Sequence, residues 1–426
     1  KDALILKNGA RLVKEFPHIP GIDFSGKVVE SQNEKFKTGD EIILTGWRVG
    51  EIYYGGYSQY AKVNGDFLVK KPKELTSKQA MILGTAGFTA LMCSFAVKAK
   101  EELLLGEKTT NVLVTGASGQ IGSELIPELR KLNGDENVVA SLNKTPMTKE
   151  VGNSGPNTKI DIRNIDEIDS AIKKYNIETI YHLGSILSAS AEMNRKLAYQ
   201  VNFNGLNNIL ESSVANNVKK VMLVSSIAAF GPGTPSENTP NDTIQKPNTH
   251  YGISKVFTEL IGNYFSTKLN LDVRGVRLPG IISWKVEPTA GTTDYAVAIF
   301  YEAIKKQSYT CPLAENTKLP MMYMPDAILS LIMLEKAEKA KLKHFSDFNV
   351  NSMSFTPQDL AIAINKRIPG FKINYEINPM LQSIADSWPD KLDDSIARTE
   401  WGWNPKYDLN SMVDDMIINL TNKLKN

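Results

Sequence analysis

The spacing of apolar residues divides the chain into two unlike parts. Residues 1–107 hold short apolar runs interrupted by Gly and Pro, as in IPGIDFSGKVVE, a texture that predicts a compact, mostly β module. From residue 108 onward, strand-like runs such as NVLVTG and KKVMLVSS alternate with helix-like segments such as IGSELIPELRKL and IDEIDSAIKKY. Alternating units of this kind predict an α/β fold with a doubly wound parallel sheet covered by helices on both faces.

The same pattern predicts a further division after the sheet. Residues 108–285 carry the alternating strands and helices of a Rossmann-type nucleotide-binding domain, and the charged stretch 98–111 marks its start. Residues 286–426 are expected to form a smaller substrate-binding part, some segments of which return to the sheet. Within it, the segment FTPQDLAIAI opens a helix with Thr356 as N-cap and Pro357 in the first turn.

Composition indicates a globular protein of two or three domains, because the 426 residues are 42% hydrophobic and 23% charged. The formal net charge of +2 gives no basis for a nucleic-acid partner or an acidic membrane partner. The sequence shows neither a signal-peptide pattern nor an apolar run of about 18 residues, so a cytoplasmic location is expected. Cys93 and Cys311 are predicted to be buried free thiols, and no metal site is expected.

A glycine-rich segment, VLVTGASGQIGSEL, stands at a strand-to-helix junction. Gly116, Gly119 and Gly122 follow the predicted strand directly and lie where the next helix begins. Glycines at these positions allow a tight turn, a close approach of backbone to phosphate, and close packing of helix on strand. The free N–H groups at the start of the helix favour an anion. The segment therefore predicts dinucleotide binding, with a purely structural glycine turn as the alternative.

The residues after the second predicted strand bear on the choice of dinucleotide. Sites that prefer NAD commonly place Asp or Glu there, whereas this chain has Leu142, Asn143 and Lys144. NAD is expected, and NADP stays open because no carboxylate stands at that position to repel a 2′-phosphate. Asp161, after the next strand-like piece, either bonds the adenine or serves as a turn residue.

One tyrosine–lysine pair is set apart by its neighbours. Tyr251 and Lys255 lie four residues apart, a spacing that also occurs at residues 264–268 and 301–305. Only Tyr251 follows a strand-end serine, Ser226, at a distance in sequence that allows a loop to join them. We expect the phenol to act as base, with its pKa lowered by the Lys255 ammonium and a bound nicotinamide. The alternative is a solvated helix face beside a Ser-rich turn.

From about residue 111 to the C-terminus, the sequence resembles a family of the extended short-chain dehydrogenase/reductases, the epimerase-like L-threonine 3-dehydrogenases. The resemblance is carried by VLVTGASGQIGSEL, YHLGSILSASAE, VNFNGLNNILE, SSIAAFGPGTPSENTP, YGISK, LPMMYMPDAI and IADSWPDKLDDSIARTEWGW. It implies an oxidoreductase that oxidises the 3-hydroxyl of L-threonine to 2-amino-3-ketobutyrate with NAD. It also implies a homodimer and an amino-acid substrate. A sugar-nucleotide epimerase or dehydratase and a non-catalytic dinucleotide-binding protein are the alternatives.

The resemblance assigns roles to individual residues. Tyr251 becomes the base, Ser226 its partner at the substrate hydroxyl, and Lys255 the lysine that holds the nicotinamide ribose. Two departures from the family are the missing acid after the second strand and Leu278, which stands where an aromatic residue is usual. The cofactor-binding residues are expected to be Gly116, Gly119, Gln120, Ile121, Gly122, Asp161, Ile162, Leu183, Gly184, Tyr251, Lys255 and Leu278. The substrate-binding residues are expected to be Ser188, Ser226, Tyr251, Thr292 and Thr293, with Ser283, Thr289, Asp294 and Asp326 as further polar groups of that region.

Residues 1–100 resemble a different family, the zinc-free medium-chain reductases of the quinone oxidoreductase or acrylyl-CoA reductase type. The stretches FPHIPGIDFSGKVVE, FKTGDEIILTGWRVGE and GGYSQYAKVNGDFLV carry the likeness, which implies a GroES-like first domain. The likeness ends where that family's own nucleotide-binding domain would begin. Residues 1–107 are therefore expected to be a fragment of such a domain joined to a complete short-chain dehydrogenase.

Overall fold

The computed structural model describes residues 2–8, 13, 15–90, 110–288 and 291–425. The chain forms two compact units, residues 1–108 and residues 109–426. The expected boundary at residues 107 and 108 lies outside the described residues, as does Cys93. Cys311 is free and buried, as its sequence context predicts.

The first unit is a small antiparallel sheet with long turns. Its strands pair in the order β1-β2-β3, with Leu44 of the central strand fully buried. Residues 77–90 are helical, and the Asp23 carboxylate accepts the Thr85 backbone N–H at 2.8 Å, which fastens this helix to the sheet. The named elements of this unit are α1 (Asp2–Asn8), β1 (Asp23–Lys27), β2 (Glu41–Thr45), η1 (Gly65–Phe67) and β3 (Leu68–Lys70).

The second unit is built on a seven-stranded sheet in the order β13-β9-β8-β7-β4-β5-β6, with every neighbouring pair parallel. Its central strands are buried on both faces, so they read as continuous apolar runs rather than alternating ones. This confirms the Rossmann-type prediction. The strands are β4 (Val112–Thr115), β5 (Val138–Leu142), β6 (Asn157–Lys159), β7 (Thr179–His182), β8 (Lys220–Ser226), β9 (Asp272–Leu278) and β13 (Phe348–Asn349).

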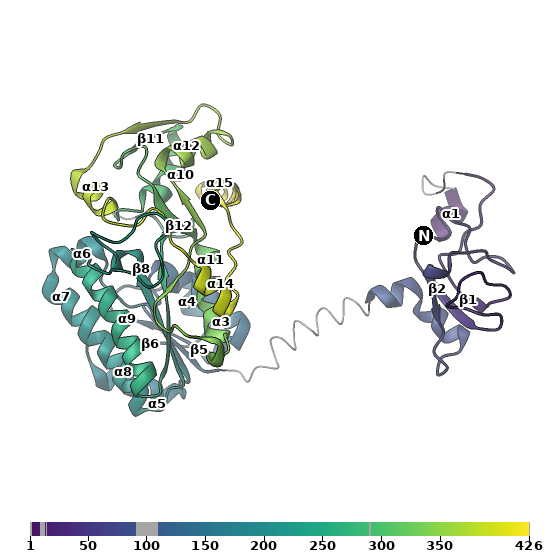
Figure 1. Ribbon diagram of the computed structural model, residues 1–426, viewed down its shortest axis with the longest axis horizontal. Helices are drawn as coiled ribbons and strands as arrows, with labels where there is room; N and C mark the ends of the chain where they lie inside the picture. The colour runs from purple at the N-terminus through teal and green to yellow at the C-terminus, as the bar shows by residue number, and fades with distance from the viewer. Residues whose placement is uncertain (1, 9–12, 14, 91–109, 289–290, 426) are drawn as a thin grey trace. The chain divides into compact units, whose positions relative to one another are not determined.

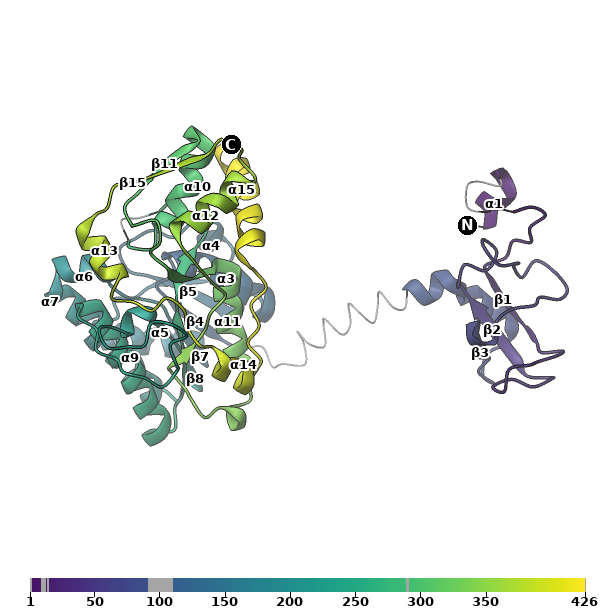
Figure 2. The same ribbon diagram turned by 45° about the horizontal axis from the view of Figure 1, so that its top comes forward.

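Helices cover both faces of this sheet (Figures 1 and 2). On one face α5 packs on α8 and α8 on α9, while on the other α3 packs on α11. The helices of the first face are α5 (Ile165–Tyr175), α6 (Ser188–Met193), α7 (Arg195–Tyr199), the π-helical turn η3 (Gln200–Gly205), α8 (Leu206–Ala215) and α9 (His250–Lys268). Those of the other face are α3 (Gln120–Asn133), α11 (Met324–Lys336) and α14 (Ser395–Trp401). The short elements η2 (Asp135–Asn137) and α4 (Lys149–Asn153) lie beside α3, η4 (Ile227–Ala229) lies beside α9, and η5 (Lys339–Lys341) follows α11.

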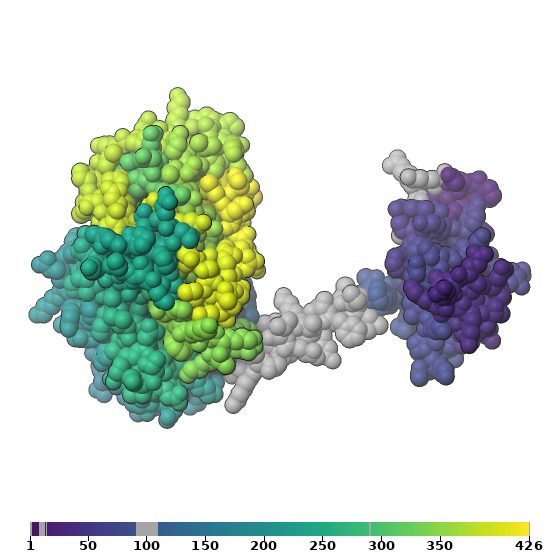
Figure 3. Space-filling model, viewed as in Figure 1, coloured from purple at the N-terminus to yellow at the C-terminus, as the bar shows by residue number. Residues whose placement is uncertain are grey.

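The remaining C-terminal elements gather beyond one end of the sheet, where Figure 3 shows them in green and yellow against the teal helices. They enclose a second apolar core that includes Phe300, Tyr323 and Met416. Thr356 caps α12 in a capping box with Asp359, as its sequence predicts. These elements are β10 (Gly280–Ile282), α10 (Tyr295–Lys306), β11 (Ser308–Cys311), β12 (Leu319–Tyr323), β14 (Met353–Phe355), α12 (Pro357–Asn365), β15 (Lys372–Tyr375), α13 (Pro379–Ala385) and α15 (Leu409–Lys425).

The parallel strands end at one edge of the sheet, and this edge positions the candidate site. Thr115 of β4 lies beside His182 of β7, and Ser226 of β8 lies beside Leu278 of β9. The loops that follow these strands therefore gather at the carboxyl edge, where open α/β sheets bind their ligands.

Candidate active site

The three glycines of the turn between β4 and α3 leave little or no room for a Cβ. Gly116 has a φ of +74°, and a Cβ there would lie 2.8 Å from the Gly184 nitrogen. A Cβ on Gly122 would lie 2.4 Å from the Gly116 carbonyl oxygen, and one on Gly119 would lie 3.2 Å from the same atom. The three glycines thus let the turn fold tightly against the loop that holds Leu183 and Gly184.

The helix that follows begins without a side-chain cap. Gly119 is its N-cap residue, and the helix starts at Gln120 and Ile121. Backbone N–H groups of an uncapped first turn carry a partial positive charge and point out of the helix. Together with the bare glycine turn, this N-terminus fits the pyrophosphate of a dinucleotide.

Asp161 lies just past β6 and is held by its neighbours. Its carboxylate accepts the backbone N–H of Arg163 at 3.1 Å and the guanidinium Nε at 2.9 Å. Hydrogen bonds from Arg163, with a contribution from the Asn143 side chain, lower the pKa of Asp161 to about 2. Although the residues after β5 lack an acid, a carboxylate from the next strand therefore lies against Asn143. Its bonds to Arg163 also form the turn that was the alternative role for Asp161.

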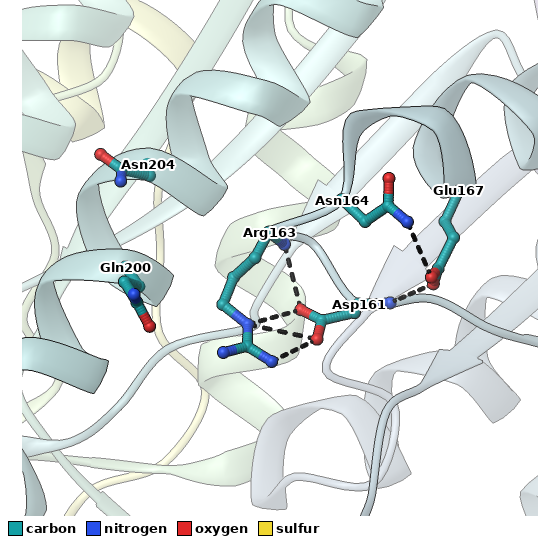
Figure 4. A pocket seen from close by; sticks show the side chains of 6 residues that line it. All are labelled: Asp161, Arg163, Asn164, Glu167, Gln200 and Asn204. Carbon is teal, nitrogen blue, oxygen red and sulfur yellow. Dashed lines mark hydrogen bonds and ion pairs between the residues drawn. The ribbon is translucent and has the colours of Figure 1, made fainter.

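A polar pocket opens beside Asp161 (Figure 4). The Arg163 side chain curls back onto Asp161, while Gln200 and Asn204 extend from η3 on the other side. Ile162, next to Asp161, is buried against Gly205, where a Cβ would lie 2.7 Å from the Ile162 Cδ1. The lining residues are Asp161, Arg163, Asn164, Glu167, Gln200 and Asn204.

His182, at the end of β7, is a buried residue at this edge that the sequence did not single out. Its Nδ1 lies 2.8 Å from the Thr115 hydroxyl oxygen. Burial lowers the pKa of His182 to about 3, with a further contribution from the Lys255 ammonium. The imidazole is therefore neutral. Its position at the end of a strand-like run was the feature of the sequence that could have identified His182 as a site residue.

Tyr251, Ser226 and Lys255 meet at the end of β8. Helix α9 is capped by Thr249, whose side chain accepts the Gly252 N–H at 3.0 Å, and this places Tyr251 in the first turn. The Ser226 side chain lies near enough to the Tyr251 phenol to lower the pKa of that phenol. The Lys255 Nζ lies 5.2 Å from the centre of the Tyr251 ring and donates to the Val224 carbonyl at 2.7 Å. The structure thus brings the expected trio together at the end of β8.

Burial shifts the pKa values of Tyr251 and Lys255. It raises the pKa of Tyr251 to about 12, although the hydrogen bond from Ser226 opposes the rise. It lowers the pKa of Lys255 to about 8, while the nearby Glu259 carboxylate opposes that fall. The expected lowering of the phenol pKa involved a bound nicotinamide as well as Lys255, so it stays a prediction for the complex with cofactor. The ammonium bonds to a backbone carbonyl, and loss of water around the phenol dominates.

The two other tyrosine–lysine pairs have different surroundings. Tyr264 is half exposed on α9 and makes an edge contact with Phe265. Tyr301, in α10, receives a hydrogen bond from the Lys423 Nζ at 2.9 Å. The structure therefore distinguishes Tyr251 from both, since of these three phenols only that of Tyr251 lies beside the strand-end serine named above.

The expected substrate residues other than Ser226 and Tyr251 come from two segments. Ser188 starts α6, which packs against α9, where the Glu192 carboxylate accepts the His250 N–H at 2.6 Å. Thr292 is buried just before α10. Thr293 lies against Gly280, where a Cβ would be 2.8 Å from the Thr293 Cγ2. Thr293 is thereby placed beside the strand end that carries the buried Leu278.

The other polar groups proposed for this region have structural partners. The Ser283 hydroxyl donates to the buried Glu124 carboxylate. The Asp326 carboxylate is fully buried and accepts the backbone N–H groups of Lys406 and Tyr407 at 2.8 and 3.0 Å. Asp294 is the N-cap residue of α10, and Thr289 lies outside the described residues. Ser283 and Asp326 therefore fasten the fold, and the expectation that they serve the substrate is not supported by their contacts.

Asn202, in η3, is a second buried polar residue that the sequence did not single out. Its side chain accepts the Ile186 N–H at 2.8 Å and donates to the Ile186 carbonyl at 2.9 Å. The same amide lies 3.3 Å from the Ser254 hydroxyl on α9. Asn202 thus fixes the loop before Ser188 relative to the helix that carries Tyr251.

No helix among the described residues is both long enough and apolar enough to cross a bilayer. Nor do they contain a group of three or more His, Cys, Asp or Glu side chains arranged to hold a metal ion.

Residues 112–350 match the NAD dependent epimerase/dehydratase family, and residues 1–73 match the alcohol dehydrogenase GroES-like domain, so both resemblances are confirmed. An uncharacterized epimerase/dehydratase of Staphylococcus haemolyticus is 42% identical over 74% of this chain and 99% of its own length. An L-threonine dehydrogenase structure from Clostridium difficile is 46% identical, covering 74% of this chain and 99% of that one, with a TM-score of 0.73. A monomeric L-threonine 3-dehydrogenase structure from a metagenome database is 41% identical, covering 73% and 99%, with a TM-score of 0.70. The glycine turn, the Tyr251 trio and these matches together place the chain in the NAD dependent epimerase/dehydratase family.

Proposed function

We propose that this protein is an L-threonine 3-dehydrogenase that uses NAD. The contact that carries the proposal joins the Tyr251 phenol to Ser226 above the Lys255 ammonium, at the sheet edge that also holds the glycine turn. The likeness to solved L-threonine dehydrogenases, which extends over nearly the whole length of those chains, supports the choice of substrate.

The residues of the trio take separate roles in this proposal. Ser226 holds the 3-hydroxyl of threonine, and Tyr251 takes the hydroxyl proton on its phenol oxygen as the carbonyl of 2-amino-3-ketobutyrate forms. A nicotinamide held at this edge would supply the acceptor for the hydride that leaves C3. Lys255 supplies a positive charge beneath the Tyr251 ring. Because the pKa of the phenol is about 12 in the chain alone, the positive charges beside it are needed to favour the phenolate.

The proposed cofactor contacts follow from the same edge. The uncapped N-terminus of α3 holds the pyrophosphate, with Gly116, Gly119 and Gly122 leaving it room. The pKa of Asp161 is about 2, so this residue is ionised at neutral pH and keeps a negative charge next to Asn143. A 2′-phosphate near this carboxylate would be repelled, and the Arg163 guanidinium is already paired with it. These charges favour NAD over NADP.

The first test is reduction of cofactor by the full chain, followed by absorbance of the reduced dinucleotide as L-threonine is varied. We expect threonine-dependent reduction, with kcat/KM for NAD at least about ten-fold above that for NADP because of the Asp161 charge. Cofactor that stays bound and unreduced with threonine would contradict the substrate and favour an epimerase. A preference for NADP would contradict only the role given to Asp161.

We further propose that residues 108–285 bind the cofactor and residues 286–426 complete the substrate site. Tyr251, Ser226 and Leu278 lie on the first of these parts, and Thr292 and Thr293 on the second. The GroES-like residues 1–107 are given no part in this reaction.

We also propose that the chain forms a homodimer through α9. Its outward face carries Ile253, Leu260 and Tyr264, which are 50%, 63% and 51% exposed. Phe257 lies between them and contacts Phe203 of η3 at 5.0 Å between ring centres. The spacing of these four residues forms one helical stripe. A second copy of the same stripe would bury it.

Leu260→Glu is therefore expected to convert a dimer into a monomer, because a carboxylate would be buried at the centre of the paired stripes. Light scattering after size-exclusion chromatography measures the mass of the full chain and of the variant. Ile418→Glu is the matched control, since Ile418 is 60% exposed on α15. A full chain that is already monomeric would contradict the proposal, and so would a dimer unaffected by Leu260→Glu.

A further inference from the structure

A buried carboxylate lies one helical turn beyond Lys255. Glu259 is 1% exposed, and its Oε1 and Oε2 each accept a guanidinium N–H of Arg277 at 2.8 Å. Oε1 also accepts the Ser225 hydroxyl at 2.5 Å, and Oε2 accepts the Gln245 amide at 2.6 Å. Four donors therefore satisfy this one carboxylate.

The donors tie α9 to two neighbouring strands at a defined position. Ser225 of β8 and Arg277 of β9 are direct cross-strand partners, and both reach Glu259. Each stands one residue before a strand end of the candidate site, Ser226 on β8 and Leu278 on β9. A shift of α9 along the sheet would break these bonds and move Tyr251 away from Ser226.

The Glu259 carboxylate also acts on Lys255, because its negative charge raises the pKa of the Lys255 ammonium. From α9 itself, Lys255 is faced by Glu259 and by the Tyr251 ring. From β7 it is faced by the neutral His182, and from β8 by the Val224 carbonyl. From β9, the Arg277 guanidinium pairs with Glu259 at 2.8 Å.

We propose that Glu259 is a positioning residue for the proposed dehydrogenase, holding α9 in register on β8 and β9 and keeping a negative charge beside Lys255. This role rests on the proposed function, in which Lys255 must be an ammonium beneath the Tyr251 ring. Glu259 contacts neither the tyrosine nor Ser226 in the bonds above, so it acts through Lys255 and through the placement of the helix.

Glu259→Gln tests the charge, because the amide keeps the size of the side chain and one acceptor oxygen. Without the carboxylate, the pKa of Lys255 falls further below its usual value, so the ammonium is lost at lower pH. We expect the alkaline limb of the kcat profile to move down by about one pH unit. At the pH optimum of the full chain, kcat should fall about ten-fold while the KM for threonine changes little.

Asp272→Asn is the matched control, since Asp272 pairs with Arg274 at the opposite end of β9 through bonds of 2.9 and 2.8 Å. It removes a carboxylate partner from an arginine of the same strand, and it should lower thermal stability without moving the pH profile. Glu259→Asp keeps the charge and is expected to restore most of the alkaline limb. An equal, pH-independent loss of activity in Glu259→Gln and Asp272→Asn would overturn the proposal.

A readout that does not need turnover separates this proposal from the proposed function. Protein labelled with ¹³C at the lysine Cε position allows the titration of Lys255 to be followed by NMR, with Lys255→Arg to assign the signal. The Lys255 titration should move to lower pH in Glu259→Gln, whether or not threonine is oxidised. If that variant does not fold, Glu259→Asp should show a smaller shift in the same direction. An unmoved titration in a folded variant would overturn the role of Glu259, whereas an inactive full chain would overturn only the proposed function.

Discussion

Replacing Tyr251 by Phe is expected to lower kcat for threonine-dependent reduction by about a thousand-fold, within the range for loss of a general base. The phenol is the group proposed to take the hydroxyl proton, and the substitution removes one oxygen atom that lies beside Ser226. The affinity for the dinucleotide should change little, because the glycine turn and α3 are untouched. Steady-state rates and fluorescence of the bound reduced cofactor measure the two effects separately.

Tyr264→Phe is the control for this substitution. It removes the same oxygen from the same helix, within the same tyrosine–lysine spacing, but at a half-exposed position. Its rate should match that of the unaltered chain. If Tyr251→Phe kept more than about a tenth of the activity, the phenol would not be the base.

Gly122→Ala is expected to weaken dinucleotide binding by about a hundred-fold or more, through the cost of overpacking a tight turn. The added methyl group would lie 2.4 Å from the Gly116 carbonyl oxygen and 2.9 Å from the Ala117 Cα, and both are backbone atoms. The turn must therefore open where the pyrophosphate is proposed to bind. Titration of the reduced cofactor, followed by its fluorescence, measures the affinity.

Gly152→Ala provides the comparison, because a Cβ at Gly152 in α4 would meet no atom within 4 Å. This substitution should leave the affinity unchanged and slightly raise the stability, since alanine favours a helix over glycine. An unaltered affinity in a folded Gly122→Ala protein would exclude the turn as the cofactor site. A thermal melt of both variants separates lost binding from lost folding.

Much of the fold follows from patterns that are local in sequence. The apolar runs ending at Thr115, His182 and Ser226 predicted buried parallel strands, because a strand covered on both faces needs apolar residues at successive positions. The glycine spacing predicted the turn before α3 for a similarly local reason. Because parallel strands end at a common edge, these patterns also brought Ser226 together with Tyr251. The site roles themselves stay predictions until the variants are measured.

The tertiary structure decided what depends on burial and on partners far apart in the chain. Glu259 is unremarkable in sequence, yet Ser225, Gln245 and Arg277 converge on its carboxylate. The sequence offered Asp326 and Ser283 as polar groups for a substrate. In the structure Asp326 accepts the Tyr407 N–H, and Ser283 donates to Glu124. The sequence by itself determined that Ser226 and Tyr251 meet at the sheet edge, because parallel strands end on one side, but it did not single out His182 there. The direction of the Tyr251 pKa shift was decided only by the tertiary structure, because it depends on how much water the surrounding elements exclude from the phenol.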